Sequence, residues 1–408
     1  MAGIAQRISK QTVMRRQTGL GNVGSATGQV IRRENSTFQA PRDTFKSNEI
    51  VSHHQSTGAS LGMRKPTGQL NGELSAGTYQ MIEEGMLEAV YATAATITGT
   101  DIAAVGDAGG IASFTSGASG FLTSDFKIGM VVRATGFTGG STNSNSRNFW
   151  ISGLTAGTMT GIFLDGTLQV ADAAAESVTI AEQGKRCLVP LTGHVKQYLQ
   201  VEEWYGDLTD SDLFNDVIVG SVDYDLPPSG NAKFSASFVG LGRTLSGAQV
   251  MSGPTAETTT GIMSSINGLI YVNGSEQTLT GLKISLKNGA AHTGAEIGSN
   301  SAGDVSKGVV EVEGSFTSQL RDQVVSALFE AETEISIASV LTADQTATSE
   351  FKAFTIGKVR ITSDPPDDNA SISRTYSFVA RLNPTGTVVG TDKAWDSTIF
   401  TVQDSDAA

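Results

Sequence analysis

Alternating apolar and polar residues mark two similar stretches of this chain. Residues 220–240 read GSVDYDLPPSGNAKFSASFVG, and residues 357–380 read GKVRITSDPPDDNASISRTYSFVA. Each begins with a period-two run, which indicates a half-buried strand, and then turns through Pro-Pro and Asn-Ala. Each ends on a second strand that contains Ser-Phe-Val. The pattern predicts one β-hairpin that occurs twice.

A strand followed by a helix is predicted before each hairpin. Residues 68–86 and 308–329 both open with alternating apolar positions and then shift to helical spacing. Ser75 and Thr317 are the expected N-caps, because a hydroxyl can accept a hydrogen bond from a free amide of the first turn. The apolar helix positions are Tyr79, Ile82 and Met86 in the first stretch, and Leu320, Val324, Val325 and Leu328 in the second.

The spacing of these landmarks indicates an insertion. Gly68 and Gly220 are 152 residues apart, whereas Gly308 and Gly357 are 49 apart, so 103 residues occur in the first unit only. Residues 92–190 combine many small residues with short apolar runs and frequent turn signals, which is typical of short strands. They predict a small inserted β-barrel or sandwich, immunoglobulin-like in kind, that enters and leaves at neighbouring points.

The predicted fold is therefore mainly β, with one unit of strands and a flanking helix present twice. Within the second unit, Asn273-Gly274 is the strongest hairpin signal, since both residues suit a primed two-residue turn. Residues 213–216 are expected to form a short turn or helical element. The expected divisions are a flexible basic arm (1–34), a first unit (35–91 and 191–244), the inserted domain (92–190), a linker (245–263), a second unit (264–383) and a tail (384–408).

Composition narrows the functional classes. The 408 residues carry a net charge of −13, but residues 1–46 hold eight Lys or Arg and only two acids. An acidic body argues against tight nucleic-acid binding, because such affinity needs cations that neutralise phosphates. The basic arm could dock on the acidic surface of another copy. No membrane span and no secretion signal are predicted, since no sufficiently long apolar run occurs.

No catalytic, cofactor or metal motif is found, so no site residue of any kind is assigned. Gly19-Leu-Gly21-Asn-Val-Gly24 matches a dinucleotide fingerprint in letters only, because no apolar strand precedes it and no amphipathic helix follows. Cys187 is expected to be a plain buried thiol. The four histidines do not form a ligand pattern; they are His53, His54, His194 and His292.

Acidic clusters also have ordinary interpretations. Asp364, Asp367 and Asp368 surround the second Pro-Pro turn and could bind calcium, but turn chemistry is favoured because the first hairpin has Asp225 and Ser229 there instead. The pairs Glu83-Glu84 and Glu202-Glu203 are expected on solvated faces rather than as acid/base pairs. These features together favour a structural protein.

Several phrases resemble the major tail tube proteins of long-tailed (siphovirus-like) bacteriophages. Residues 45–87 contain a polar extended loop, then GQLNGEL, GTYQ and a helix, as that family does. Residues 121–137 (FLTSDFKIGMVVRATGF) are similar to a small β domain found inside some members. IYVNG, GVVEVEGSFTSQL and the second Pro-Pro hairpin also look like the family. The resemblance covers most of residues 36–382.

This resemblance implies a β-sandwich with one flanking helix, and rings of subunits that stack into a tube. The duplicated chain would close a pseudo-sixfold ring as a homotrimer. The tube would be an acidic-lined conduit for double-stranded DNA during ejection, built around a tape-measure protein and contacting tail terminator and tail-tip proteins. The long loops 45–66 and 288–304 would bridge successive rings. The chain would be made in the host cytoplasm and reside in the virion.

Two alternatives come from other classes. One is another virion β protein, such as a decoration, fibre or adhesin-like module, which stacked rings with a uniform bore would separate from a tube. The other is a carbohydrate-active enzyme, which would require a pocket that gathers two carboxylates from distant parts of the chain.

Overall fold

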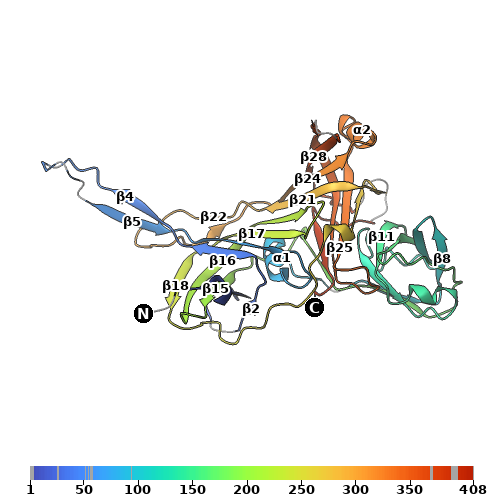
Figure 1. Ribbon diagram of the computed structural model, residues 1–408, viewed down its shortest axis with the longest axis horizontal. Helices are drawn as coiled ribbons and strands as arrows, with labels where there is room; N and C mark the ends of the chain where they lie inside the picture. Colours follow the sequence, from blue (N-terminus) through green and yellow to red (C-terminus); the bar gives the residue numbers. More distant parts are fainter. Residues whose placement is uncertain are drawn as a thin grey trace.

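The computed structural model describes residues 4–24, 27–50, 52–53, 55, 58–92, 94–367, 371–386 and 394–407. Within them the chain is mainly β, with two short α-helices, α1 (Gln80–Leu87) and α2 (Val324–Glu330). Figure 1 shows an elongated molecule, with a hairpin projecting at one end and a separate sheet at the other. Three 3₁₀ turns are also present: Arg7–Ser9, Gly140–Ser144 and Ser265–Asn267.

One continuous sheet runs through both halves of the chain. Antiparallel pairing joins its strands in the order β3 (Asn35–Gln39), β6 (Thr67–Glu73), β17 (Lys233–Val239), the second half of β16 (Asp210–Leu226), β21 (Leu279–Lys287), β24 (Glu311–Gln319), β28 (Ser373–Ala380) and the second half of β26 (Phe351–Ser363). The short β27 (Pro366–Asp367) continues β26 beside β28. We call these strands the eight-stranded sheet.

The first halves of β16 and β26 leave this sheet and enter two other layers. Around β16 the order is β18 (Gly242–Ser246), β16, β15 (Leu199–Tyr205), β1 (Lys10–Arg16) and β2 (Gln29–Val30). Around β26 the order is β14 (Lys185–Leu188), β29 (Thr401–Asp404), β26, β25 (Ile335–Thr342), β19 (Gly268–Val272) and β20 (Ser275–Glu276). We call these the first and second outer layers.

The same strand order and the same irregularities occur in both halves. β15, β16, β17 and β18 pair in one half as β25, β26, β28 and β29 pair in the other. Each half has two β-bulges at matching places, and a bulge bends a strand and re-aims its side chains. The bulges lie between Leu199 and Val201, Ile335 and Ile337, Val219 and Ser221, and Ile361 and Ser363.

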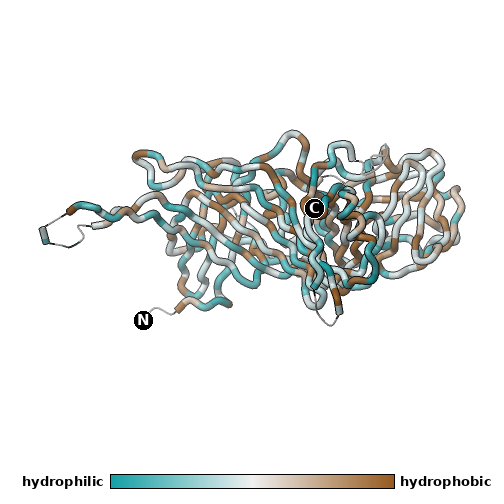
Figure 2. The backbone as a smooth tube through the Cα atoms, turned by 90° about the horizontal axis from the view of Figure 1, so that it is seen from above, coloured by the Kyte–Doolittle hydropathy of each residue, from teal (hydrophilic) through white to brown (hydrophobic). Residues whose placement is uncertain are grey.

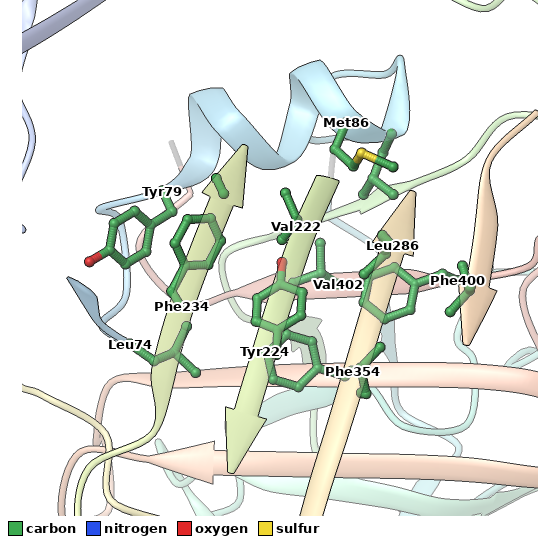
Figure 3. Packing of buried hydrophobic residues seen from close by; sticks show 14 of the residues in the cluster. Leu74, Tyr79, Met86, Val222, Tyr224, Phe234, Leu286, Phe354, Phe400 and Val402 are labelled. Atoms are coloured by element: carbon green, nitrogen blue, oxygen red, sulfur yellow. The ribbon is translucent and has the colours of Figure 1, made fainter. Parts of the chain in front are cut away.

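Aromatic side chains fill the space between the eight-stranded sheet and the outer layers (Figure 3). Tyr79, just before α1, stacks on Phe234 of β17 with ring centroids 4.0 Å apart. Tyr224 of β16 lies 4.6 Å from Phe354 of β26, which joins the two halves in one core. Burying such rings is a major source of stability.

A second sheet of residues 96–182 lies apart from these layers. Its strand order is β7 (Thr96–Gly99), β13 (Val178–Glu182), β10 (Val131–Thr135), β11 (Phe149–Leu154), β12 (Thr158–Phe163), β9 (Ile111–Ser116) and β8 (Ile102–Ala108). Because only two residues join the edge strands β7 and β8, the sheet must curl towards closure. One curled sheet replaces the two packed sheets of an immunoglobulin-like sandwich.

This curled sheet is anchored on the second outer layer. Its apolar core includes Trp150, which lies 4.8 Å from Tyr271 of β19, and it continues into Val340 of β25 and Phe351 of β26. The curled sheet therefore packs on the side of the molecule opposite the solvent-exposed face of the eight-stranded sheet.

The projecting hairpin consists of β4 (Arg42–Lys46) and β5 (Ala59–Arg64), as Figure 1 shows. At its base it contacts the other long loop, which contains β22 (Ala291–His292) and β23 (Val305–Ser306). The Arg64 amide donates to the Asn300 carbonyl at 2.8 Å. The two loops that were expected to bridge rings, 45–66 and 288–304, thus lie side by side at one end of the molecule.

Several expectations from the sequence are confirmed. Both predicted hairpins form, as β16–β17 and β26–β28, and the first turns through Pro227-Pro228. The second Pro-Pro pair was expected in the turn but lies on the strand before it, since Pro366 pairs with Arg374. The Asn273-Gly274 turn joins β19 to β20 with φ of 51° and 76°. α1 buries Ile82 and Met86 as predicted.

The expectation of an irregular N-terminal arm is wrong over residues 10–16. These residues form β1, which pairs with β15 along its full length, and Val13 and Met14 are fully buried. No alternation is visible there because three successive residues, Thr12 to Met14, are all buried. Likewise β29 places residues 401–404 of the expected tail inside the second outer layer.

Three local expectations are also wrong. Residues 213–216 belong to the continuous strand β16, in which Asp216 has a positive φ of 54° at a β-bulge. Ser75 and Thr317 do not cap the helices: Tyr79 and Gln323 precede them, without side-chain caps. Leu320 precedes α2 rather than lying within it.

Candidate functional site

The eight-stranded sheet has two open edges. Among the described residues, β3 pairs only with β6, and β26 from Arg360 onward, together with β27, pairs only with β28. An open strand edge presents unpaired N–H and C=O groups, which can bind another strand. A molecule with two such edges at opposite ends of one sheet can join further copies in series.

The solvent-exposed face of this sheet is polar, and its charges nearly balance. Alternation directs most apolar residues of each strand into the core and leaves mainly Ser, Thr, Asn and Gln outside, with six carboxylates and five cations. Cross-strand ion pairs neutralise some of them, such as Lys283 with Asp225 and Lys287 with Glu313. The eleven charged residues are Glu73, Asp223, Asp225, Glu311, Glu313 and Asp367, and Lys233, Lys283, Lys287, Lys358 and Arg360.

The projecting hairpin carries apolar side chains that the rest of the chain does not cover. Phe45 is 61% exposed, Leu61 is 65% exposed and Ile50 is fully exposed near the tip. Figure 2 shows brown, hydrophobic segments in this hairpin, away from the body. A two-stranded hairpin is only marginally stable in water by itself, so these features indicate a surface for another chain.

A buried ion cluster ties the two halves together. Lys352 of β26 donates to Glu83 of α1 and lies 3.3 Å from Asp404 of β29, and all three side chains are fully buried. Tyr224 and Tyr91 also donate to Glu83, at 2.9 and 2.5 Å. Burial lowers the pKa of Lys352, but the two carboxylates outweigh it, so its pKa lies above the ordinary value and the lysine stays charged.

A second ion cluster ties the curled sheet to the second outer layer. The Arg186 guanidinium donates to Glu182 at 3.0 Å, to Asp396 at 2.6 Å and to Asp125 at 3.1 Å. The second carboxylate oxygen of Glu182 accepts the Ala95 amide at 2.9 Å. Burial raises the pKa of Glu182 to about 7, although Arg186 acts in the opposite direction.

Glu182 therefore predicts a pH dependence of stability. An acid whose pKa is higher in the folded state stabilises the fold while protonated, and this contribution is lost as pH rises from about 4.5 to about 7. Glu182→Gln removes that loss. From pH 5 to pH 8 we therefore expect the unfolding free energy of the variant, relative to that of the wild type, to rise by roughly 2–3 kcal/mol. Urea unfolding at both pH values measures it. A difference that does not change with pH would contradict this assignment.

The acidic pairs are not solvated, contrary to expectation. Glu83 accepts from Lys352, and Glu84 pairs with Arg16. Glu202 accepts the amides of Val250 and Met251 at 2.6 and 2.8 Å. Glu203 lies 2.6 Å from the Lys10 ammonium. The cations and backbone amides named here are all distant in sequence from these acids, and no local pattern signals such a contact.

The other candidate residues do not converge. The loop of the glycine fingerprint is held by the Gly21 amide, which donates to Asp216 at 2.6 Å, and β2 rather than a helix follows it. His194 lies near Glu88, and His292 contacts the Gly240 carbonyl. Asp364 pairs with Arg374 across the second hairpin. Cys187 is buried, and burial raises the pKa of its thiol. His54 and Asp368 lie outside the described residues.

Within the described part of the chain, no three His, Cys, Asp or Glu side chains gather as a metal site would require. None of the described helices is long and apolar enough to span a membrane. A surface groove of about 640 Å³ contains two carboxylates, Glu34 and Glu257. Three cations, Arg7, Lys10 and Arg33, also line that groove, and its described lining includes no histidine or cysteine.

Comparison with known proteins agrees with this arrangement of open edges, polar face and projecting hairpin. The family model described as phage tail tube protein matches residues 8–380. No curated protein matches the chain. The match covers most of the sequence and begins before β1, which is consistent with β1 being part of the folded body. The chain therefore belongs to the phage tail tube protein family, the structural proteins that self-assemble into the tube of the virion tail.

Proposed function

We propose that three copies of the chain close a ring through their eight-stranded sheets, and that such rings stack into the tail tube of a siphovirus-like phage. The observation that carries this proposal is the continuity of one sheet through both halves, four strands from each, with an open edge at either end. A head-to-tail contact that uses both edges forms a closed ring when the rotation permits.

The two halves are, in this proposal, two copies of one tube domain. The matching strand order and the four matching bulges support a duplication, since bulge positions persist within a family. A ring of three chains then has pseudo-sixfold symmetry. The curled sheet of residues 96–182 is an insertion in the first copy alone.

The exposed face of the eight-stranded sheet would line the bore. Eight strands from each of three chains give 24; with strands ~4.8 Å apart and tilted about 40°, the barrel has a backbone diameter of roughly 48 Å. Inward side chains reduce the opening to on the order of 35–40 Å, wide enough for a DNA duplex. With six carboxylates and five cations this face is nearly neutral, so a bore lined by it would be less acidic than the sequence suggested.

A polar lining with paired charges suits transport. Unpaired cations would bind phosphate and retard the DNA, whereas a strongly acidic wall would repel it. The curled sheet packs behind the second outer layer and would stand on the outer wall of the tube. No catalysis and no cofactor is required. The partners are further copies, a tape-measure protein, the tail terminator and tip proteins, and DNA in passage, in particles assembled in the host cytoplasm.

Mass measurement tests this function. The purified full-length chain, examined by light scattering at rising concentration, is expected to form a species of three times the 42.4-kDa chain and then long polymers. A closed oligomer that never elongates and has no central hole would instead support a decoration or fibre protein.

A further inference from the structure

The junction between the two halves is a template for the junction between two chains. Within one chain, β16 of the first half pairs with β21 of the second half over six consecutive residue pairs. Two of these pairs are Tyr224 with Ile284 and Asp225 with Lys283. The open edges belong to the strands that correspond to these two, namely β26–β27 and β3.

The correspondence is fixed residue by residue. In the second half, Gly314 of β24 pairs with Ile284 of β21 on one side and with Phe378 of β28 on the other. In the first half, Gly68 of β6 pairs in the same way with Phe38 of β3 and with Phe238 of β17. Position 38 therefore corresponds to position 284.

The bulges align the other edge. Val219 of β16 and Ile361 of β26 stand at the same bulge, each opposite the hairpin phenylalanine. Tyr224 is five residues after Val219, and Pro366 is five residues after Ile361. Positions 366 and 367 therefore correspond to positions 224 and 225.

From this correspondence we propose that β26–β27 of one chain pairs with β3 of a second copy, with Pro366 opposite Phe38 and Asp367 opposite Thr37. This inference rests on the proposed ring and specifies the register of its joint. The two faces match: Phe38 is half-buried at the open edge and packs on Phe214 and Phe238, while Thr37 is on the polar face.

A proline weakens this joint relative to the internal one. The Pro365 carbonyl accepts the Thr375 amide, so residue 365 directs its backbone groups towards β28, and residue 366 directs them towards the open edge. Pro366 has no N–H to donate there, whereas Tyr224 at the internal junction has one. Proline on an open edge is a known means of limiting uncontrolled pairing. With one hydrogen bond fewer, this strand pairing joins free chains only weakly. It is maintained within a closed ring.

Disulfide trapping tests the register. Thr37 and Asp367 would form a non-hydrogen-bonded pair, whose Cα atoms lie about 4.5 Å apart and so permit a disulfide. Thr37→Cys with Asp367→Cys, assembled under reducing conditions and then mildly oxidised, is expected to give covalent dimers and trimers on a non-reducing gel. Asn35→Cys with Asp367→Cys is the matched control, shifted by two residues on the same exposed face, and should crosslink at least tenfold less. Cys187 is buried and does not compete.

The outcomes separate the register from the function. Tubes that form without crosslinking, or that crosslink equally in the control, would overturn the register and leave the tail tube function standing. Failure of the unmodified chain to form any ring or tube would overturn both. As an independent measurement, Pro366→Val is expected to lower the concentration needed for assembly severalfold, while Pro228→Val in the first hairpin turn leaves it unchanged. An unchanged concentration for Pro366→Val would contradict the role of this edge.

Discussion

Replacing Lys352 with methionine is expected to lower the free energy of unfolding by about 3–5 kcal/mol. The substitution keeps the volume but leaves Glu83 and Asp404 buried next to one another without a cation. Removing one member of a buried ion pair is costly because the remaining charge can be neither solvated nor compensated. Because the three residues come from α1, β26 and β29, the loss would loosen the contact between the two halves. Thermal and urea unfolding measure it.

Two further variants make this prediction specific. Lys358→Met, six residues further along β26, removes an ammonium that lies 3.6 Å from the partly exposed Glu334, and should change stability by less than about 1 kcal/mol. Adding Glu83→Gln and Asp404→Asn to Lys352→Met removes the unpaired charges and should recover much of the lost stability. Equal effects of Lys352→Met and Lys358→Met would show that the buried cluster is not a joint between the halves.

Ile50→Asp is expected to abolish tube elongation while rings still form. Ile50 is fully exposed near the tip of the projecting hairpin, where no other described part of the chain covers it. In a stacked tube such a tip would bury its apolar side chain against the next ring, and a buried carboxylate without a partner would oppose that contact strongly. Electron microscopy and sedimentation of the variant should show single rings and at least a tenfold loss of polymer.

Leu168→Asp provides the matched control for the hairpin. Leu168 follows the last strand of the β11–β12 pair in the curled sheet and is 63% exposed. It adds the same charge to a similarly exposed apolar site on the proposed outer wall, and tubes should elongate as in the wild type. If Ile50→Asp formed tubes of normal length, the hairpin would not be the contact between rings.

Regular periodicity allowed the local elements to be predicted. Residues 220–226 and 233–239 alternate strictly, and they form the paired ends of β16 and β17. The helix around Ile82 and Met86 followed from helical spacing. Turn chemistry at Asn273-Gly274 was sufficient to place a hairpin. In each case the physical cause lies within a few residues, so the sequence contains it.

Features that depend on distant contacts could not be predicted. Thr12 to Met14 are all buried because β1 lies between β15 and β2, so no alternation is visible in this strand. Glu83 resembles a surface acid until Lys352, 269 residues away, is placed beside it. The near balance of charges on the exposed face of the eight-stranded sheet depends on which side of each strand a side chain lies. Net charge, an average over the whole chain, gave no information about that face.

Cryo-electron microscopy of the assembled full-length chain tests the central claim most directly. Because the curled sheet occurs once per chain, a ring of three chains should show three outer lobes around a channel of roughly 35–40 Å, lined by the eight-stranded sheets. The inner wall should nevertheless appear nearly sixfold. Six lobes per ring, or a closed particle without a channel, would contradict the account.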